Sequence, residues 1–201
     1  MILGDRFDRA LAWASLLHRA QQRKGSEVPY VAHLLATAAI AVEHGASEDE
    51  AIAALLHDAI EDQAVSFGGA PELRAAIRER FGETVLAIVE ACTDADTMPK
   101  PPWKERKVAY LARLAQAGPP VLLVSCADKL HNVRSTVADL AATTDPEAYW
   151  KKFNGGRDGT LWYYRSLARI FLERFPGRLS EELARAVLEL TVLAKPKAAS
   201  P

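Results

Sequence analysis

The strongest restriction on how this chain can fold comes from residues 46–63, which read ASEDEAIAALLHDAIEDQ. Ser47, followed three residues later by Glu50, has the spacing of a helix-capping box, and the residues after it are almost all apolar. The apolar run ends in four side chains that can carry charge: His57, Asp58, Glu61 and Asp62. Because carboxylates are rarely buried without a partner or a metal ion, this segment is either a helix end that reaches water or one wall of a site.

Helical spacing of apolar residues, with Gly or Pro near the ends, recurs along most of the chain. The segments that this pattern predicts as helices are 5–22, 29–45, 47–63, 71–81, 84–93, 103–117, 119–135, 145–153, 160–175 and 180–193. Residues 121–126, VLLVSC, could also form a strand, but their neighbours are helical and Pro119 and Pro120 suit a helix start, so we favour a helix. We expect residues 154–159, NGGRDG, to interrupt the helices.

These segments predict an all-α protein, a single compact domain of about eight to ten helices. The 201 residues, 49% of them hydrophobic, are sufficient for one sizeable core. We expect the domain to span residues 1–195 and residues 196–201 to form a flexible tail.

Charge and cysteine content restrict the surroundings of the protein. Lys and Arg number 25 against 26 Asp and Glu, so the balance indicates neither nucleic acid nor an anionic membrane as a partner. No stretch reaches about 18 apolar residues, and the start has no signal-peptide pattern. Cys92 and Cys126 lie in apolar contexts, as expected of reduced, buried thiols. We therefore expect a cytoplasmic protein that acts on a small molecule, and the sequence indicates no oligomeric state.

Four potential metal ligands lie on otherwise apolar segments that are far apart in the sequence. His33 lies within YVAHLLATAAIAV, His57 and Asp58 end IAALLHD, and Asp128 follows VLLVSCA. Helical proteins build metal sites from side chains that converge from facing helices. Two imidazoles and two carboxylates suit one divalent ion such as manganese, iron or zinc, and they leave positions for water that the ion can activate.

Polar residues one helical turn beyond these ligands indicate a reaction. Glu61 and Asp62 each lie four residues beyond a proposed ligand, so in a continuous helix a base would stand over the metal. Asn132 lies four residues beyond Asp128 and could hold a phosphate or a hydroxyl group. A single histidine on an apolar face is more often a core residue, and only the combination of four ligands favours a metal site. The histidines that we expect to be core or exposed residues are His18, His44 and His131.

Three successive segments resemble the signature segments of a known family: HRAQQRKGSEVPYVAH, ALLHDAIED and ADKLHNVRS. They are similar to those of HD-superfamily alarmone hydrolases, which comprise the hydrolase half of RelA/SpoT homologues and stand-alone small alarmone hydrolases, and include a related metazoan enzyme. The resemblance spans about residues 7–164 and includes an Arg-Lys pair before the first histidine that generic HD phosphohydrolases lack. It implies the HD-domain helical fold and a single-domain hydrolase.

The resemblance also implies roles for individual residues. The residues that match the family's metal ligands, usually of one manganese ion, are His33, His57, Asp58 and Asp128. Those that match its water-activating pair are Glu61 and Asp62. Those that match its nucleotide contacts are Arg23, Lys24, Asn132, Ser135 and Tyr164. Of these, Arg23 would stack on a purine base and Lys24 would contact a phosphate.

The chain departs from the family pattern in its details. Leu34 follows the first histidine where relatives have proline, and Ser135 replaces threonine but keeps the hydroxyl group. Residues 153–167, FNGGRDGTLWYYRSL, align only loosely, so the choice between guanine and adenine stays open. The basic stretch KPPWKERK, residues 100–107, could offset phosphate charge or be a solvated helix face, and for any single lysine we favour the solvated face.

We therefore expect metal-dependent hydrolysis of a purine nucleotide with a 3′-pyrophosphate, such as ppGpp or ppApp, with release of pyrophosphate. This is the activity of a guanosine-3′,5′-bis(diphosphate) 3′-pyrophosphohydrolase. Two alternatives stay open: another HD phosphohydrolase, such as a nucleotidase or an NADPH 2′-phosphatase, and a non-catalytic nucleotide sensor. The complete ligand set together with Glu61 and Asp62 argues against the sensor. The product, pyrophosphate or orthophosphate, would separate the two kinds of enzyme.

Overall fold

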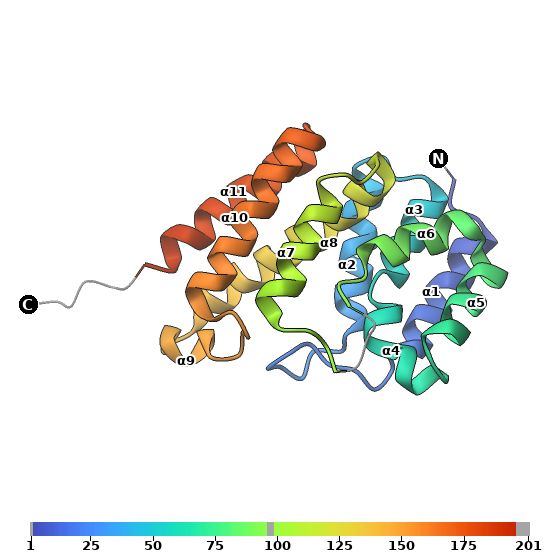
Figure 1. The fold of residues 1–201 in the computed structure, drawn as a ribbon, viewed down its shortest axis with the longest axis horizontal. Helices are drawn as coiled ribbons and strands as arrows, with labels where there is room; N and C mark the ends of the chain where they lie inside the picture. The colour runs from blue at the N-terminus through green and yellow to red at the C-terminus, as the bar shows by residue number, and fades with distance from the viewer. Residues whose placement is uncertain (1, 96–98, 196–201) are drawn as a thin grey trace, which may run out of the picture.

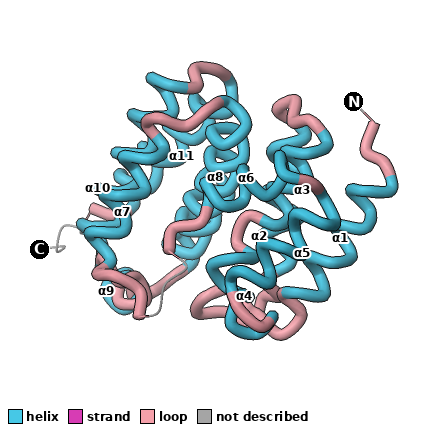
Figure 2. The backbone as a smooth tube through the Cα atoms, turned by 45° about the vertical axis from the view of Figure 1, so that its right-hand side comes forward, coloured by secondary structure: helices cyan, strands magenta, loops and turns pink. Residues whose placement is uncertain are grey.

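Eleven helices form the regular structure of residues 2–95 and 99–195, which are the residues that the computed structural model describes (Figure 1). Their bounds are α1 (Asp5–Leu17), α2 (Val31–Glu43), α3 (Glu48–Leu56), α4 (Ala59–Phe67), α5 (Ala70–Phe81), α6 (Glu83–Cys92), α7 (Trp103–Leu114), α8 (Pro119–Ala142), α9 (Pro146–Trp150), α10 (Gly156–Arg174) and α11 (Arg178–Leu193). No strand occurs in this part of the chain (Figure 2). The prediction of an all-α fold is confirmed, and residues 121–126 are helical, as favoured.

Signals between neighbouring residues account for several of these helix ends. Ser47 accepts a hydrogen bond from the backbone N–H of Glu50, whose carboxylate accepts one from the N–H of Ser47, so the predicted capping box begins α3. Asp145 accepts a hydrogen bond from the N–H of Ala148 at the start of α9. α8 begins at Pro119, where a missing N–H group removes no helical hydrogen bond.

The segment predicted as one helix over residues 47–63 is two helices. α3 ends just before His57 and α4 begins just after Asp58, so these two residues form the junction. The His57 ring donates from Nδ1 to the carbonyl oxygen of Ala54 at 2.8 Å, and the Asp58 side chain does not cap α4. This additional break explains why the described residues contain eleven helices where the pattern predicted about eight to ten.

The expected interruption at residues 154–159 is wrong in part, because α10 already begins at Gly156. Gly155 and Gly159 lie against the ring of Trp103, the first residue of α7. A Cβ atom on Gly155 would lie 2.5 Å from that ring, a distance that real side chains do not tolerate. These two glycines therefore bring the start of α10 into contact with α7, and Gly159 lies within the helix.

α8 is the central helix of the fold. It contacts α2, α3, α6, α10 and α11, and its inward-facing residues are buried from Leu122 to Leu140. In Figure 1, α10 and α11 lie together at one side of the molecule, and α1 and α3–α6 lie at the other. Figure 2 shows from a second direction that α10 and α11 lie opposite α1, α3 and α5, with α8 between them. Polar residues on α2, on α8 and at the α3–α4 junction are thereby brought together inside the protein.

Other expectations concern cysteines, membranes and the chain end. Cys92 and Cys126 are free and buried, as expected. Among the described residues, no helix combines the length and the apolar character needed to cross a membrane. Residues 196–201, which we expected to form a flexible tail, lie outside the described residues, and the domain boundary at residue 195 stays a prediction.

Candidate active site

Four side chains converge between the helices: His33 from α2, His57 and Asp58 from the α3–α4 junction, and Asp128 from α8. The Nε2 atoms of the two histidines lie 3.2 Å apart. Oδ2 of Asp58 lies 3.0 Å from Nε2 of His57 and 3.5 Å from Nε2 of His33. Oδ1 of Asp128 lies 3.3 Å from Nε2 of His33 and 3.6 Å from Nε2 of His57. Both histidines and Asp128 are buried, and Asp58 is half-buried.

This set of donor atoms fits one divalent ion. Ligands that lie about 2.1 Å from an ion, at right angles to each other, are about 3 Å apart, close to the separations seen here. The ligand atoms of His33, His57 and Asp58 all lie within 4.8 Å of one another. Because Nδ1 of His57 carries the hydrogen that it donates to Ala54, its Nε2 presents a lone pair to the cluster. A shared cation would offset the repulsion between lone pairs that face each other in this way.

Neighbouring side chains hold the two carboxylates in place. Tyr30 donates from its hydroxyl group to Oδ2 of Asp58 at 2.5 Å. Asn132 donates to Oδ1 of Asp128, and Lys129 forms an ion pair with its Oδ2, each at 2.5 Å. Burial opposes ionisation of Asp128, but the charge of Lys129 and the nearby imidazoles outweigh it and hold the pKa of this carboxyl well below its ordinary value. Asp128 is therefore in the ionised form that binds metals.

Sequence reasoning missed three residues of this site: Tyr30, Lys129 and His131. His131 was expected in the core or in solvent, yet its Nδ1 lies 2.7 Å from Nδ1 of His33. Burial and the neighbouring His33 lower the pKa of His131 to about 4, so the His131 ring is neutral near pH 7. Its Nδ1 can then accept a hydrogen bond from Nδ1 of His33, and Nε2 of His33 faces the cluster. The only signal in the sequence for these three residues is that each lies within three positions of a proposed metal ligand, His33 or Asp128.

Glu61 and Asp62 lie in the first turn of α4, each bound to a side chain from another segment. The break between α3 and α4 removes the continuous helix from which their position above the ligands was inferred. Glu61 accepts a hydrogen bond from Lys100 at 2.7 Å, and Asp62 accepts one from Gln21 at 2.7 Å. Although the Asp62 side chain is exposed to solvent, partial loss of hydration and the charge of Asp58 raise its pKa to about 6. Asp62 can therefore exchange a proton close to neutral pH.

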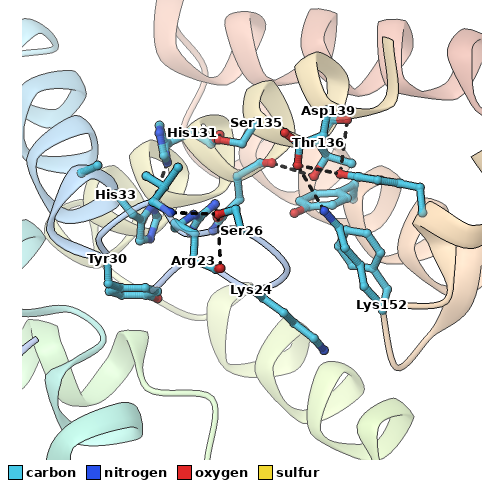
Figure 3. Close-up of a pocket in the computed structure, with 16 residues that line it drawn as sticks. Arg23, Lys24, Ser26, Tyr30, His33, His131, Ser135, Thr136, Asp139 and Lys152 are labelled. Atoms are coloured by element: carbon cyan, nitrogen blue, oxygen red, sulfur yellow. Dashed lines mark hydrogen bonds and ion pairs between the residues drawn. The ribbon is translucent and has the colours of Figure 1, made fainter. Parts of the chain in front are cut away.

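A cavity of about 380 Å³ opens beside the cluster, with His33 in its wall. It is lined by all five residues that the family resemblance associated with the nucleotide: Arg23, Lys24, Asn132, Ser135 and Tyr164. Arg23 donates to Oδ1 of Asn132 at 2.9 Å, which ties the loop before α2 to α8. In Figure 3 the Arg23 side chain lies near His33, and Lys24 extends away from both. We call this space the nucleotide cavity.

A second cavity, of about 350 Å³, adjoins the nucleotide cavity. The residues that line both are Lys24, Asn132, Phe153 and Tyr164. The basic stretch 100–107 and the loosely aligned segment 153–167, whose roles were open, meet in its wall through Trp103 and Thr160.

The basic stretch divides into two kinds of side chain. Arg106 and Lys107 line the second cavity, and both form ion pairs with Asp94. Lys104 is exposed and lies over the ring of Trp162, which agrees with the solvated face favoured for a single lysine. Arg106 and Lys107, in contrast, face the site.

Residues 10–154 match the family model of the HD domain, and because this is most of the chain, the chain belongs to that family. Similar relatives include guanosine-3′,5′-bis(diphosphate) 3′-pyrophosphohydrolases named MESH1. The protein from Xenopus tropicalis is 38% identical over 128 residues, which are 62% of this chain and 66% of that protein. The protein from Drosophila melanogaster is 34% identical over 132 residues, 64% of this chain and 68% of that protein. The chain thus matches about two thirds of the length of these relatives.

Solved structures confirm the HD fold. The structure of a metazoan orthologue of SpoT, described as hydrolysing ppGpp, is similar with a TM-score of 0.74 and 26% identity, and the match covers 94% of this chain and 97% of that one. A protein of Listeria monocytogenes is similar with a TM-score of 0.63 and 28% identity, over 77% of this chain and 96% of that one.

Proposed function

We propose that this chain is a metal-dependent guanosine-3′,5′-bis(diphosphate) 3′-pyrophosphohydrolase. Water attacks the phosphorus bound to the 3′ oxygen of a purine nucleotide, and pyrophosphate and the nucleoside 5′-diphosphate are released. One observation carries this proposal: the histidine and aspartate donor atoms lie 3.0 to 3.6 Å apart beside a cavity lined by all five expected nucleotide contacts. The activity named for the similar relatives agrees with it.

The proposed ligands of one divalent ion are His33, His57, Asp58 and Asp128. We propose manganese, with iron and zinc as alternatives, because mixed imidazole and carboxylate sites suit all three. When bound, the ion supplies positive charge beside the phosphate oxygens and lowers the pKa of water.

The protein's own groups would move the proton. Asp62, with a pKa of about 6, is ionised at neutral pH and can accept a proton from the attacking water. Glu61, held by Lys100, is proposed to orient that water or share in the transfer. The proton balance closes when the departing 3′ oxygen becomes a hydroxyl group.

The nucleotide would be held by the residues of the nucleotide cavity. Arg23 is fixed by Asn132 and can stack its planar guanidinium on a purine, whereas Lys24 is suited to a phosphate. Ser135 and Asn132 offer polar groups for the ribose or phosphate, and Tyr164 adds an aromatic ring. Stacking tolerates either purine, so we propose that Arg23 provides affinity with little choice between guanine and adenine.

The test compares ppGpp, ppApp and NADPH as substrates with manganese, with pyrophosphate and orthophosphate measured separately. We expect metal-dependent release of pyrophosphate from ppGpp, ppApp or both. Cleavage of NADPH alone, with orthophosphate as the product, would instead identify a 2′-phosphatase at the same site. Nucleotide binding without any product would identify a sensor. Either result would refute the proposal.

We also propose that the protein acts in the cytoplasm on a small nucleotide, without nucleic acid or membrane as a partner. The near-neutral charge balance supports the absence of nucleic acid as a partner, because no strong basic excess is available to bind it. The proposed domain spans residues 1–195.

A further inference from the structure

The second cavity has more cationic than anionic side chains in its wall. Its cations are Lys24, Arg106, Lys107 and Lys129, and its acids are Glu61 and Asp94. Asp94 is paired with both Arg106 and Lys107, so one carboxylate serves two cations. Their side chains are only 11% and 18% exposed, and that of Lys129 is 15% exposed. An excess of positive charge that is largely removed from water indicates a site for an anion.

This cavity lies next to the proposed metal centre. Nζ of Lys129, in its wall, reaches Oδ2 of Asp128, while Oδ1 of the same carboxylate faces the histidines. Four residues line both cavities, so the two spaces share part of their walls: Lys24, Asn132, Phe153 and Tyr164. A phosphate held at the cluster, with its nucleoside in the nucleotide cavity, therefore has its neighbouring phosphate within reach of the second cavity.

We propose that the second cavity binds the terminal phosphate of the pyrophosphate group and then holds the pyrophosphate product, with Arg106 and Lys107 as its main contacts. This inference rests on the proposed function and adds the position of the second phosphate. In the reaction, the oxygen of water bonds to the phosphorus next to the nucleoside, the bond from that phosphorus to the 3′ oxygen breaks, and the 3′ oxygen takes up a proton. The terminal phosphate keeps its bonds, but its charge requires cations throughout.

The four cationic side chains of the second cavity favour a phosphate group over an uncharged base. Trp103, which lies against Gly155 and Gly159, lines the same cavity as Arg106 and Lys107 and belongs to the same helix. The 5′-diphosphate of the nucleotide has the same chemistry as pyrophosphate, but the contact between Lys129 and Asp128 places the second cavity beside the reacting phosphate.

Calorimetric titration of the metal-free protein with inorganic pyrophosphate tests this proposal without any turnover. Lys107→Gln is expected to weaken pyrophosphate binding about tenfold or more, because a charge-assisted contact is lost. Lys107→Arg, which keeps the charge, should bind within a few fold of the parent. Lys104→Gln is the matched control, because it removes the same charge from the exposed side of α7. GDP is titrated in parallel and is expected to bind all variants equally.

Several outcomes would overturn the inference. Pyrophosphate that does not bind the parent, or that binds Lys107→Gln as tightly as the parent, removes the site. Weaker binding of GDP with unchanged binding of pyrophosphate assigns the cavity to the 5′-diphosphate instead. If thermal unfolding shows that Lys107→Gln is not folded, Arg106→Gln is titrated against the same criteria. The titrations with pyrophosphate and GDP require no hydrolysis. A protein that fails to cleave ppGpp would therefore refute the proposed function, whereas the titrations would still test the second cavity.

Discussion

The ionisation of Asp62 offers a direct test of the proposed proton transfer. Partial loss of hydration and the nearby charge of Asp58 raise its pKa from 3.8 to about 6. At pH 5 about one tenth of the molecules would carry the Asp62 carboxylate, and at pH 7 about nine tenths would. If Asp62 accepts the proton of the attacking water, kcat/KM should therefore fall about tenfold between pH 7 and pH 5.

The assay is pyrophosphate release from ppGpp between pH 5 and pH 8 with manganese. Metal content is measured at each pH, because protonation of the histidine ligands would release the ion. Asp62→Asn should remove the acidic limb and lower the plateau by about 10²–10⁴. Asp139→Asn is the matched control, since Asp139 also lines the nucleotide cavity but pairs with Lys152. A flat profile in the parent, or an acidic limb that survives in Asp62→Asn, would refute the reasoning.

The same shift affects stability in the opposite sense to activity. The pKa of Asp62 in the folded protein lies above its value in an unfolded chain, so the folded state binds the proton more tightly. The resulting stability is present at low pH and is lost as the pH rises from about 4 to about 6. Metal-free Asp62→Asn should thus unfold at a higher temperature than the parent at pH 7, and the difference should shrink toward pH 4. Equal unfolding temperatures at pH 7 would show that the fold does not raise this pKa.

Three other predictions follow from the geometry of the site. His57→Ala and Asp128→Ala should each lose the metal ion, because both donate to the same small cluster; full occupancy in both by elemental analysis would contradict the ligand assignment. Glu61→Gln should keep the metal but lower turnover by about 10² or more, and an unchanged rate would exclude a role in water activation. Gly155→Ala should lower the free energy of unfolding by about 1–3 kcal/mol, because the new Cβ would lie 2.5 Å from the Trp103 ring. Denaturant titration measures this loss, and combining the change with Trp103→Leu should reduce it.

Features that depend on neighbours along the chain were predictable from the sequence. The capping box at Ser47 was found where expected, and the helix expected from residue 145 is α9, which Asp145 caps. Both helix ends use hydrogen bonds within four residues. Helical periodicity likewise predicted an all-α fold. The break at His57 and Asp58 was not predicted, because it depends on where the His57 ring and the Asp58 carboxylate find partners rather than on a Gly or Pro signal.

Residue types along the chain determined which chemistry this protein has available: imidazoles and carboxylates for a metal, and an Arg-Lys pair for a nucleotide. Only the tertiary structure decided which atoms meet. His33 and His131 are 98 residues apart, yet their ring nitrogens lie 2.7 Å from each other. Trp103, within the basic stretch at residues 100–107, packs against Gly155 and Gly159 at the start of α10. The sequence did not indicate this contact. Contacts of this kind arise where helices pack, and the packing of two distant helices is not encoded in the spacing of residues along either one.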